Sequence, residues 1–103
     1  MAKVIDTHMH SWDLQKVRYS WLDGDTSILA QNYYPSNIEG QLQLAGVSAA
    51  IMVQAANNLE DTAFMFQCAE QYPWISGVVG WIDLLNPALA KNQLEVHLQN
   101  KYF

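Results

Sequence analysis

The hydrophobic and polar positions along the chain predict three strands, each followed by a helix. The opening segment begins with the β-branched residues Val4 and Ile5 and is expected to stay extended to Trp12. Residues 47–53 are apolar on both faces, which is typical of a parallel strand that is covered on both sides. A third strand is expected over residues 75–82. This order indicates an α/β fold with a parallel sheet.

Capping signals and apolar residues at helical spacing predict the three helices. The first is expected over residues 37–45, with Ser36 and Glu39 forming a capping box. The second begins after Asn58, and the third begins at Pro87, which suits the first turn of a helix.

Two residues with reactive side chains are expected to be structural. No basic residue stands near Cys68 in the sequence, so we interpret it as a small apolar side chain in the core. His97 lies between Glu95 and Gln99 on the third helix, where we expect a solvated side chain and a poor metal ligand. In the third strand, Gly77 and Gly80 indicate close approach of a backbone or a ligand.

The sharpest chemical signal lies in the first strand. Residues two apart point to the same side of a strand, so Asp6, His8 and His10 share one face. Two neutral imidazoles at this spacing can bind one cation, and the Asp6 carboxylate could orient one of them. Two ligands are too few for a zinc site, and a solvated surface pair is the alternative.

Polar side chains also end the other two strands. Gln54 and Asp83 follow the second and third strands, at the edge of the sheet where His8 and His10 are expected. Ligands of open parallel sheets gather at this edge, although both residues could simply bind loop backbone. In the long connection over residues 11–35, the aromatic rings could stack on a substrate or simply pack. Packing is favoured for most of them, and Trp12, which follows the two histidines, is expected to line a pocket.

Composition narrows the class of protein. The chain has 103 residues, half of them apolar, which indicates one small folded domain over residues 1–103 or part of a larger one. A net charge of −5 argues against nucleic acid and anionic membranes as partners. Its single cysteine, and the lack of an apolar run long enough to span a membrane, predict a cytoplasmic protein.

Four segments together resemble a known family. The resemblance is to the amidohydrolase-related metal-dependent hydrolases, in the branch that contains sugar lactonases. It lies in residues 5–12, Tyr19-Ser20-Trp21-Leu22, Ala45-Gly46-Val47 followed by Val53-Gln54-Ala55, and Gly77-Val78-Val79-Gly80-Trp81-Ile82-Asp83-Leu84. The resemblance covers nearly the whole chain.

The resemblance implies a (β/α)₈ TIM barrel with its active site at the carboxyl ends of parallel strands. His8 and His10 would then be metal ligands, usually to zinc, and the small-molecule substrate would be a lactone or a similar cyclic ester or amide. The remaining candidate site residues, which would contact the substrate, are Trp12, Gln54, Trp81 and Asp83. Some members decarboxylate instead, so a metal-dependent decarboxylase is the alternative.

The chain differs from the family in being much shorter than a complete barrel. A complete barrel takes roughly 250 residues, so we expect this chain to be an N-terminal fragment with the first three β/α units. The chain alone is expected to be inactive, with an incomplete metal site and no identified catalytic residue. Its unpaired strand edges predict self-association, and a non-catalytic, self-associating α/β module is a further alternative.

Overall fold

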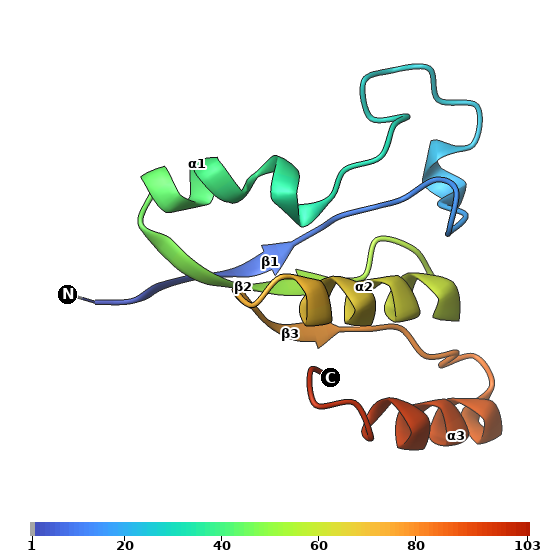
Figure 1. The fold of residues 1–103 in the computed structure, drawn as a ribbon. Helices are drawn as coiled ribbons and strands as arrows, with labels where there is room; N and C mark the ends of the chain where they lie inside the picture. Colours follow the sequence, from blue (N-terminus) through green and yellow to red (C-terminus); the bar gives the residue numbers. More distant parts are fainter. Residues whose placement is uncertain (1) are drawn as a thin grey trace.

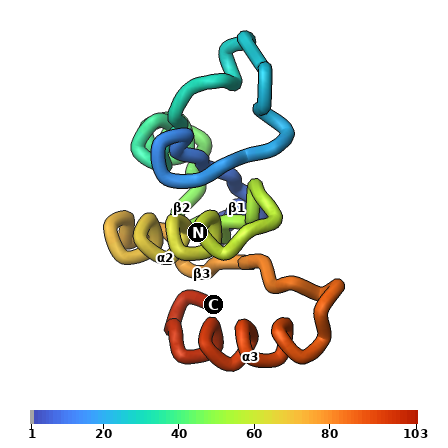
Figure 2. The backbone as a smooth tube through the Cα atoms, turned by 90° about the vertical axis from the view of Figure 1, so that its right-hand side faces the viewer, coloured from blue at the N-terminus to red at the C-terminus, as the bar shows by residue number. Residues whose placement is uncertain are grey.

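The computed structural model describes residues 2–103 and contains three parallel strands separated by helical segments (Figure 1). The elements are β1 (Val4–Met9), η1 (Ser20–Leu22), η2 (Pro35–Asn37), α1 (Glu39–Leu44), β2 (Val47–Val53), α2 (Leu59–Gln71), β3 (Ile75–Val79) and α3 (Pro87–His97), where η denotes a 3₁₀ helix. The sheet and α2 lie between α1 and α3 (Figure 1 and Figure 2).

The sheet has the order β1-β2-β3, and both strand pairs are parallel. The predicted α/β class and the predicted parallel strands are therefore confirmed, and the arrangement is consistent with the N-terminal part of a TIM barrel. The outer strands are shorter than expected. β1 ends at Met9 because Trp12 instead pairs with Tyr33 of the long connection, through two backbone hydrogen bonds of 2.9 Å.

The segment after β3 is held by side chains and not by a neighbouring strand, so β3 ends at Val79. The backbone N–H of Trp81 donates to Thr62 Oγ1 of α2 at 2.9 Å. The backbone N–H of Asp83 donates to Gln93 Oε1 of α3 at 2.8 Å. This segment is extended towards the same end of the sheet as the predicted site.

Two of the three helix starts are as predicted. Asn58 caps α2 by accepting from the N–H of Asp61 at 2.8 Å, and Asn86 caps α3. The capping box predicted at Ser36 and Glu39 is wrong. Asn37 Oδ1 accepts from the N–H of Tyr34 at 2.7 Å, which stabilises η2, and α1 begins after it without a side-chain cap.

The core lies between α2 and the sheet. Ala50 and Met52 of β2 and Met65 of α2 are fully buried, which accounts for the apolar pattern of both elements. Cys68 is buried as predicted, and burial raises the pKa of its thiol to about 12. At neutral pH the thiol is therefore protonated and acts as an apolar side chain.

The prediction that His97 is solvated is wrong. Its side chain is buried against the rings of Phe66 and Phe103, with centroids 5.8 and 5.3 Å away. Its Nε2 lies 3.1 Å from the carbonyl oxygen of Trp81. The end of α3 packs back on the segment that follows β3, which the polar neighbours Glu95 and Gln99 do not reveal.

Gly77 in β3 and Gly80 just after it mark close contacts, as expected. A Cβ at Gly77 would lie 3.5 Å from the carbonyl oxygen of Tyr102, which accepts from the N–H of Val78 at 2.7 Å. A Cβ at Gly80 would lie 2.6 Å from Thr62 Cγ2.

None of the helices among residues 2–103 has the length and apolar character needed to cross a membrane.

Candidate functional site

His8 and His10 lie side by side at the end of β1. Their ring centroids are 4.9 Å apart, with an angle of 77° between the ring planes, and both residues are exposed. The alternation of side chains along a strand explains the pairing, because His8 and His10 are two residues apart. An exposed pair of imidazoles on a rigid strand is suitable for binding a ligand.

A hydrogen bond determines which nitrogen of His10 is free. Its Nδ1 lies 2.9 Å from the carbonyl oxygen of Val53 at the end of β2. A carbonyl oxygen can only accept, so Nδ1 carries the proton. In the neutral ring, Nε2 then keeps its lone pair and can bind a metal ion, and the ring orientation is fixed by β2.

The carboxylate of Asp6 has a different role from the one expected. Its Oδ1 accepts a hydrogen bond from the backbone N–H of His8 at 3.0 Å. It therefore stabilises the backbone that leads into His8, and does not orient an imidazole.

The spacing of the two imidazoles matches that of two ligands of one metal ion, but two ligands do not complete a site. Two rings bound to a tetrahedral zinc through nitrogens at about 2.0–2.1 Å have centroids about 5 Å apart, close to the spacing here. Among residues 2–103, no group of three or more histidine, cysteine, aspartate or glutamate side chains could hold a metal.

A pocket of about 350 Å³ adjoins His10 and is lined by His10, Trp12, Trp21, Gln54 and Ala55. The prediction that Trp12 lines a pocket is confirmed. Its indole N–H donates to the carbonyl oxygen of Leu29 at 3.1 Å, and its ring meets Trp21 edge to face at 5.3 Å. The pocket wall is therefore made of two aromatic rings in fixed orientations.

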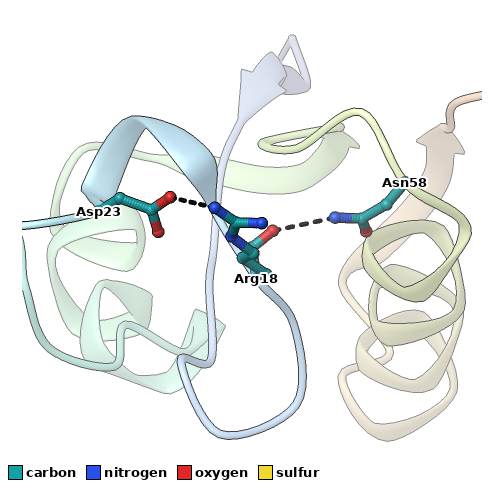
Figure 3. Close-up of polar contacts among 3 residues, drawn as sticks. All are labelled: Arg18, Asp23 and Asn58. Atoms are coloured by element: carbon teal, nitrogen blue, oxygen red, sulfur yellow. Dashed lines mark hydrogen bonds and ion pairs between the residues drawn. The ribbon is translucent and has the colours of Figure 1, made fainter.

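The long connection is tied to the loop between β2 and α2. Trp21 Nε1 donates to the carbonyl oxygen of Ala55 at 2.7 Å. Asn58 Nδ2 donates to the carbonyl oxygen of Arg18 at 2.9 Å, and Arg18 also forms an ion pair with Asp23 (Figure 3). These contacts bring Trp21 to the pocket from a distant part of the sequence.

The side chain of Asp61 holds the same loop through hydrogen bonds to its backbone. It is fully buried, and its Oδ2 accepts from the backbone N–H groups of Ala55 at 2.7 Å and Ala56 at 3.1 Å. Its Oδ1 has no hydrogen-bond partner among the described residues. Burial raises the pKa of Asp61, although the two backbone N–H groups, the nearby Tyr19 hydroxyl and His10 act in the opposite direction.

A second pocket, of about 450 Å³, contains the remaining predicted residues. Gln54, Trp81 and Asp83 all line it, and Gln54 also lines the first pocket. Gln54 Nε2 donates to Asn57 Oδ1 at 2.8 Å, and Asp83 Oδ1 accepts from the N–H of Leu85 at 3.2 Å. The four predicted substrate contacts therefore line two pockets that share Gln54, whereas His8 lines neither.

Sequence reasoning missed Trp21 and Asp61. The sequence does not single out Trp21 among the aromatic residues of the connection, most of which are expected to pack, although it stands in one of the family-like segments. Asp61 stands beside Glu60 in the first turn of α2, where the sequence by pattern indicates only a negative charge that complements the helix dipole. Its position three residues after the cap Asn58 was the available signal, because a carboxylate there can bind the backbone before the helix.

Comparisons with known proteins agree on one group of relatives. An L-fucono-1,5-lactonase of Burkholderia multivorans is 34% identical over 91 residues, which cover 88% of this chain and 31% of that protein. One from Burkholderia ambifaria is 29% identical over 80 residues, 78% of this chain and 28% of that protein. No family model matches the chain.

The fold comparison leads to the same group. A crystal structure of an amidohydrolase from Burkholderia multivorans with bound zinc superposes with a TM-score of 0.74 and 34% sequence identity. The match covers 91% of this chain and 33% of that one. The chain thus spans about a third of the length of the relatives that it matches.

Proposed function

The chain is related to the amidohydrolase-related, lactonase-like proteins over about a third of their length, and from this premise we propose that it contributes to a metal-dependent hydrolase of lactones. The substrate class is a sugar-derived lactone, since two curated relatives are L-fucono-1,5-lactonases. The metal is a divalent cation, with zinc favoured by the zinc-bound amidohydrolase.

The observation that carries this proposal is the pair of imidazoles at the end of β1. His8 and His10 would hold the metal, and the hydrogen bond from Nδ1 of His10 to the carbonyl oxygen of Val53 leaves Nε2 as the nitrogen that faces the ligand. The bound metal would polarise the lactone carbonyl and lower the pKa of a water molecule. The rest of the metal site would come from outside the described residues.

The four candidate side chains that line the two pockets would bind the substrate. Trp12 and Gln54 line the pocket beside His10, so they would contact the part of the ring next to the metal. Trp81 and Asp83 line the second pocket, where a carboxylate can accept hydrogen bonds from sugar hydroxyl groups.

The test is an assay of the protein as its gene encodes it. L-fucono-1,5-lactone is supplied with zinc, and acid release is followed in a lightly buffered solution. We expect hydrolysis, which a chelator should abolish and added zinc should restore. His8→Ala and His10→Ala should each remove the activity. Zinc-dependent release of carbon dioxide from carboxylate substrates, with no lactone opened, would instead show a decarboxylase. Lactone hydrolysis that survives both substitutions would contradict the proposed metal ligands.

A further inference from the structure

We propose that Trp21 contacts the substrate, with the face of its indole packed against the C–H groups of a saturated sugar ring. The inference rests on the function proposed above and adds a residue from the connection between β1 and α1 to the site. Trp21 lines the pocket that also contains the candidate metal ligand His10.

The first argument is that Trp21 is exposed and yet fixed. The residue is 48% exposed, which is unusual for the largest aromatic side chain. Its N–H is held by the carbonyl oxygen of Ala55, and edge-to-face contacts join it to Trp12 at 5.3 Å and to Tyr19 at 6.5 Å. An exposed ring that is already fixed loses little entropy when a ligand packs on it.

The second argument concerns the groups that the lining residues can offer to a ligand. Both indole N–H groups of the wall donate to backbone carbonyl groups, so the indoles offer only ring surface to a ligand. No lysine or arginine is among the lining residues, so the pocket wall offers no permanent positive charge to an anionic group. Polarised C–H groups of a sugar ring suit the negative face of an indole, and Gln54 can bind a neighbouring hydroxyl group.

The third argument is the support behind Trp21. The Ala55 carbonyl that holds its indole belongs to a loop whose N–H groups bind the buried carboxylate of Asp61. Tyr19, two residues before Trp21, is also buried, and its hydroxyl accepts from the N–H of Asp13 at 3.2 Å. Buried polar contacts therefore support both the loop that accepts from the indole and the segment that carries Trp21.

The test uses 1,5-anhydro-L-fucitol, which has the sugar ring but no carbonyl and cannot be hydrolysed. Its dissociation constant for the protein encoded by the gene is measured by NMR, which also follows the Trp21 indole N–H signal. We expect this signal to shift on binding and Trp21→Ala to weaken binding roughly three- to tenfold. Trp21→Phe, which keeps a ring face, should retain more of the affinity than Trp21→Ala.

The matched control is Trp74→Phe. Trp74 stands just before β3, at the other end of the sheet from the pocket, so Trp74→Phe should leave binding unchanged. Its indole N–H has no partner among the described residues, so the substitution breaks no hydrogen bond there. No binding by the wild type, or equal binding by wild type and Trp21→Ala, would overturn the inference. Binding that depends on Trp21 without hydrolysis of any lactone would refute the proposed function alone. If Trp21→Ala does not fold, an unshifted Trp21 signal in the wild type is the contradicting result.

Discussion

The Nδ1 atom of His10 lies 2.9 Å from the carbonyl oxygen of Val53, and this contact joins the end of β1 to the end of β2. It links a side chain with metal-binding chemistry to the backbone of the neighbouring strand. The parallel pairing of the two strands makes the contact possible, because their carboxyl ends meet at the same edge of the sheet. The candidate metal ligand is therefore oriented by the fold itself.

The first prediction concerns zinc binding. Replacing His8 or His10 by alanine should lower the zinc affinity of the chain by more than about tenfold, because each substitution removes one of two imidazole ligands. Calorimetric titration with zinc measures the affinity. The control is His97→Gln, since His97 is buried elsewhere against Phe66 and Phe103. Equal zinc affinity in the His8, His10 and His97 variants would refute the site.

The second prediction concerns the pH dependence of stability at Asp61. Burial raises the pKa of this carboxyl above its ordinary value of 3.8. A group whose pKa is raised on folding contributes stability that is fully present below its unfolded pKa and is lost as pH rises through the folded value. The wild type should therefore lose stability relative to Asp61→Asn as pH rises above 3.8, and the difference should then level off.

Urea denaturation followed by circular dichroism, from about pH 3 to about pH 8, measures this difference. Glu60→Gln is the matched control, because Glu60 lies in the same first turn of α2 but is exposed. A wild type that gains stability relative to Asp61→Asn over this range would mean that the pKa of Asp61 is lowered.

The third prediction compares two glycines. Gly80→Ala should destabilise the fold by about 1–3 kcal/mol, because the added methyl group would lie 2.6 Å from Thr62 Cγ2. Gly40→Ala in α1 should stabilise it by roughly 0.4–1 kcal/mol, since no described atom beyond its own helix and chain neighbours lies within 4 Å of the new Cβ. Thermal denaturation measures both changes, and equal effects would contradict the packing at Gly80.

The fourth prediction is that the 103-residue chain associates with itself. Leu85 is 98% exposed and Leu44 is 92% exposed, and both expose apolar surface to water. Sedimentation velocity at micromolar concentration should show dimers or larger species that dissociate on dilution. Leu84→Lys together with Leu85→Lys should shift the equilibrium towards monomer. A wild-type chain that stays monomeric would contradict the expectation.

Local chain geometry explains why much of the fold was predictable. β2 was predicted over residues 47–53 and observed as Val47–Val53, because a buried strand between two turns carries its own apolar pattern. Asn58 and Asn86 each accept a hydrogen bond from the N–H group three residues later, so their capping roles could also be predicted from the sequence. The ends of β1 and β3 could not be predicted in this way, because they depend on hydrogen-bond partners in the long connection and in the helices.

The same distinction applies to the site. The shared face of His8 and His10 follows from the sequence alone, because the side-chain repeat of a strand is local. By contrast, the contact of Trp21 with Ala55, 34 residues away, and the burial of His97 beside Trp81, 16 residues away, arise from the packing of distant segments. Burial and hydrogen bonding at such positions depend on which distant elements pack together, and the pattern of neighbouring residues does not encode that choice locally.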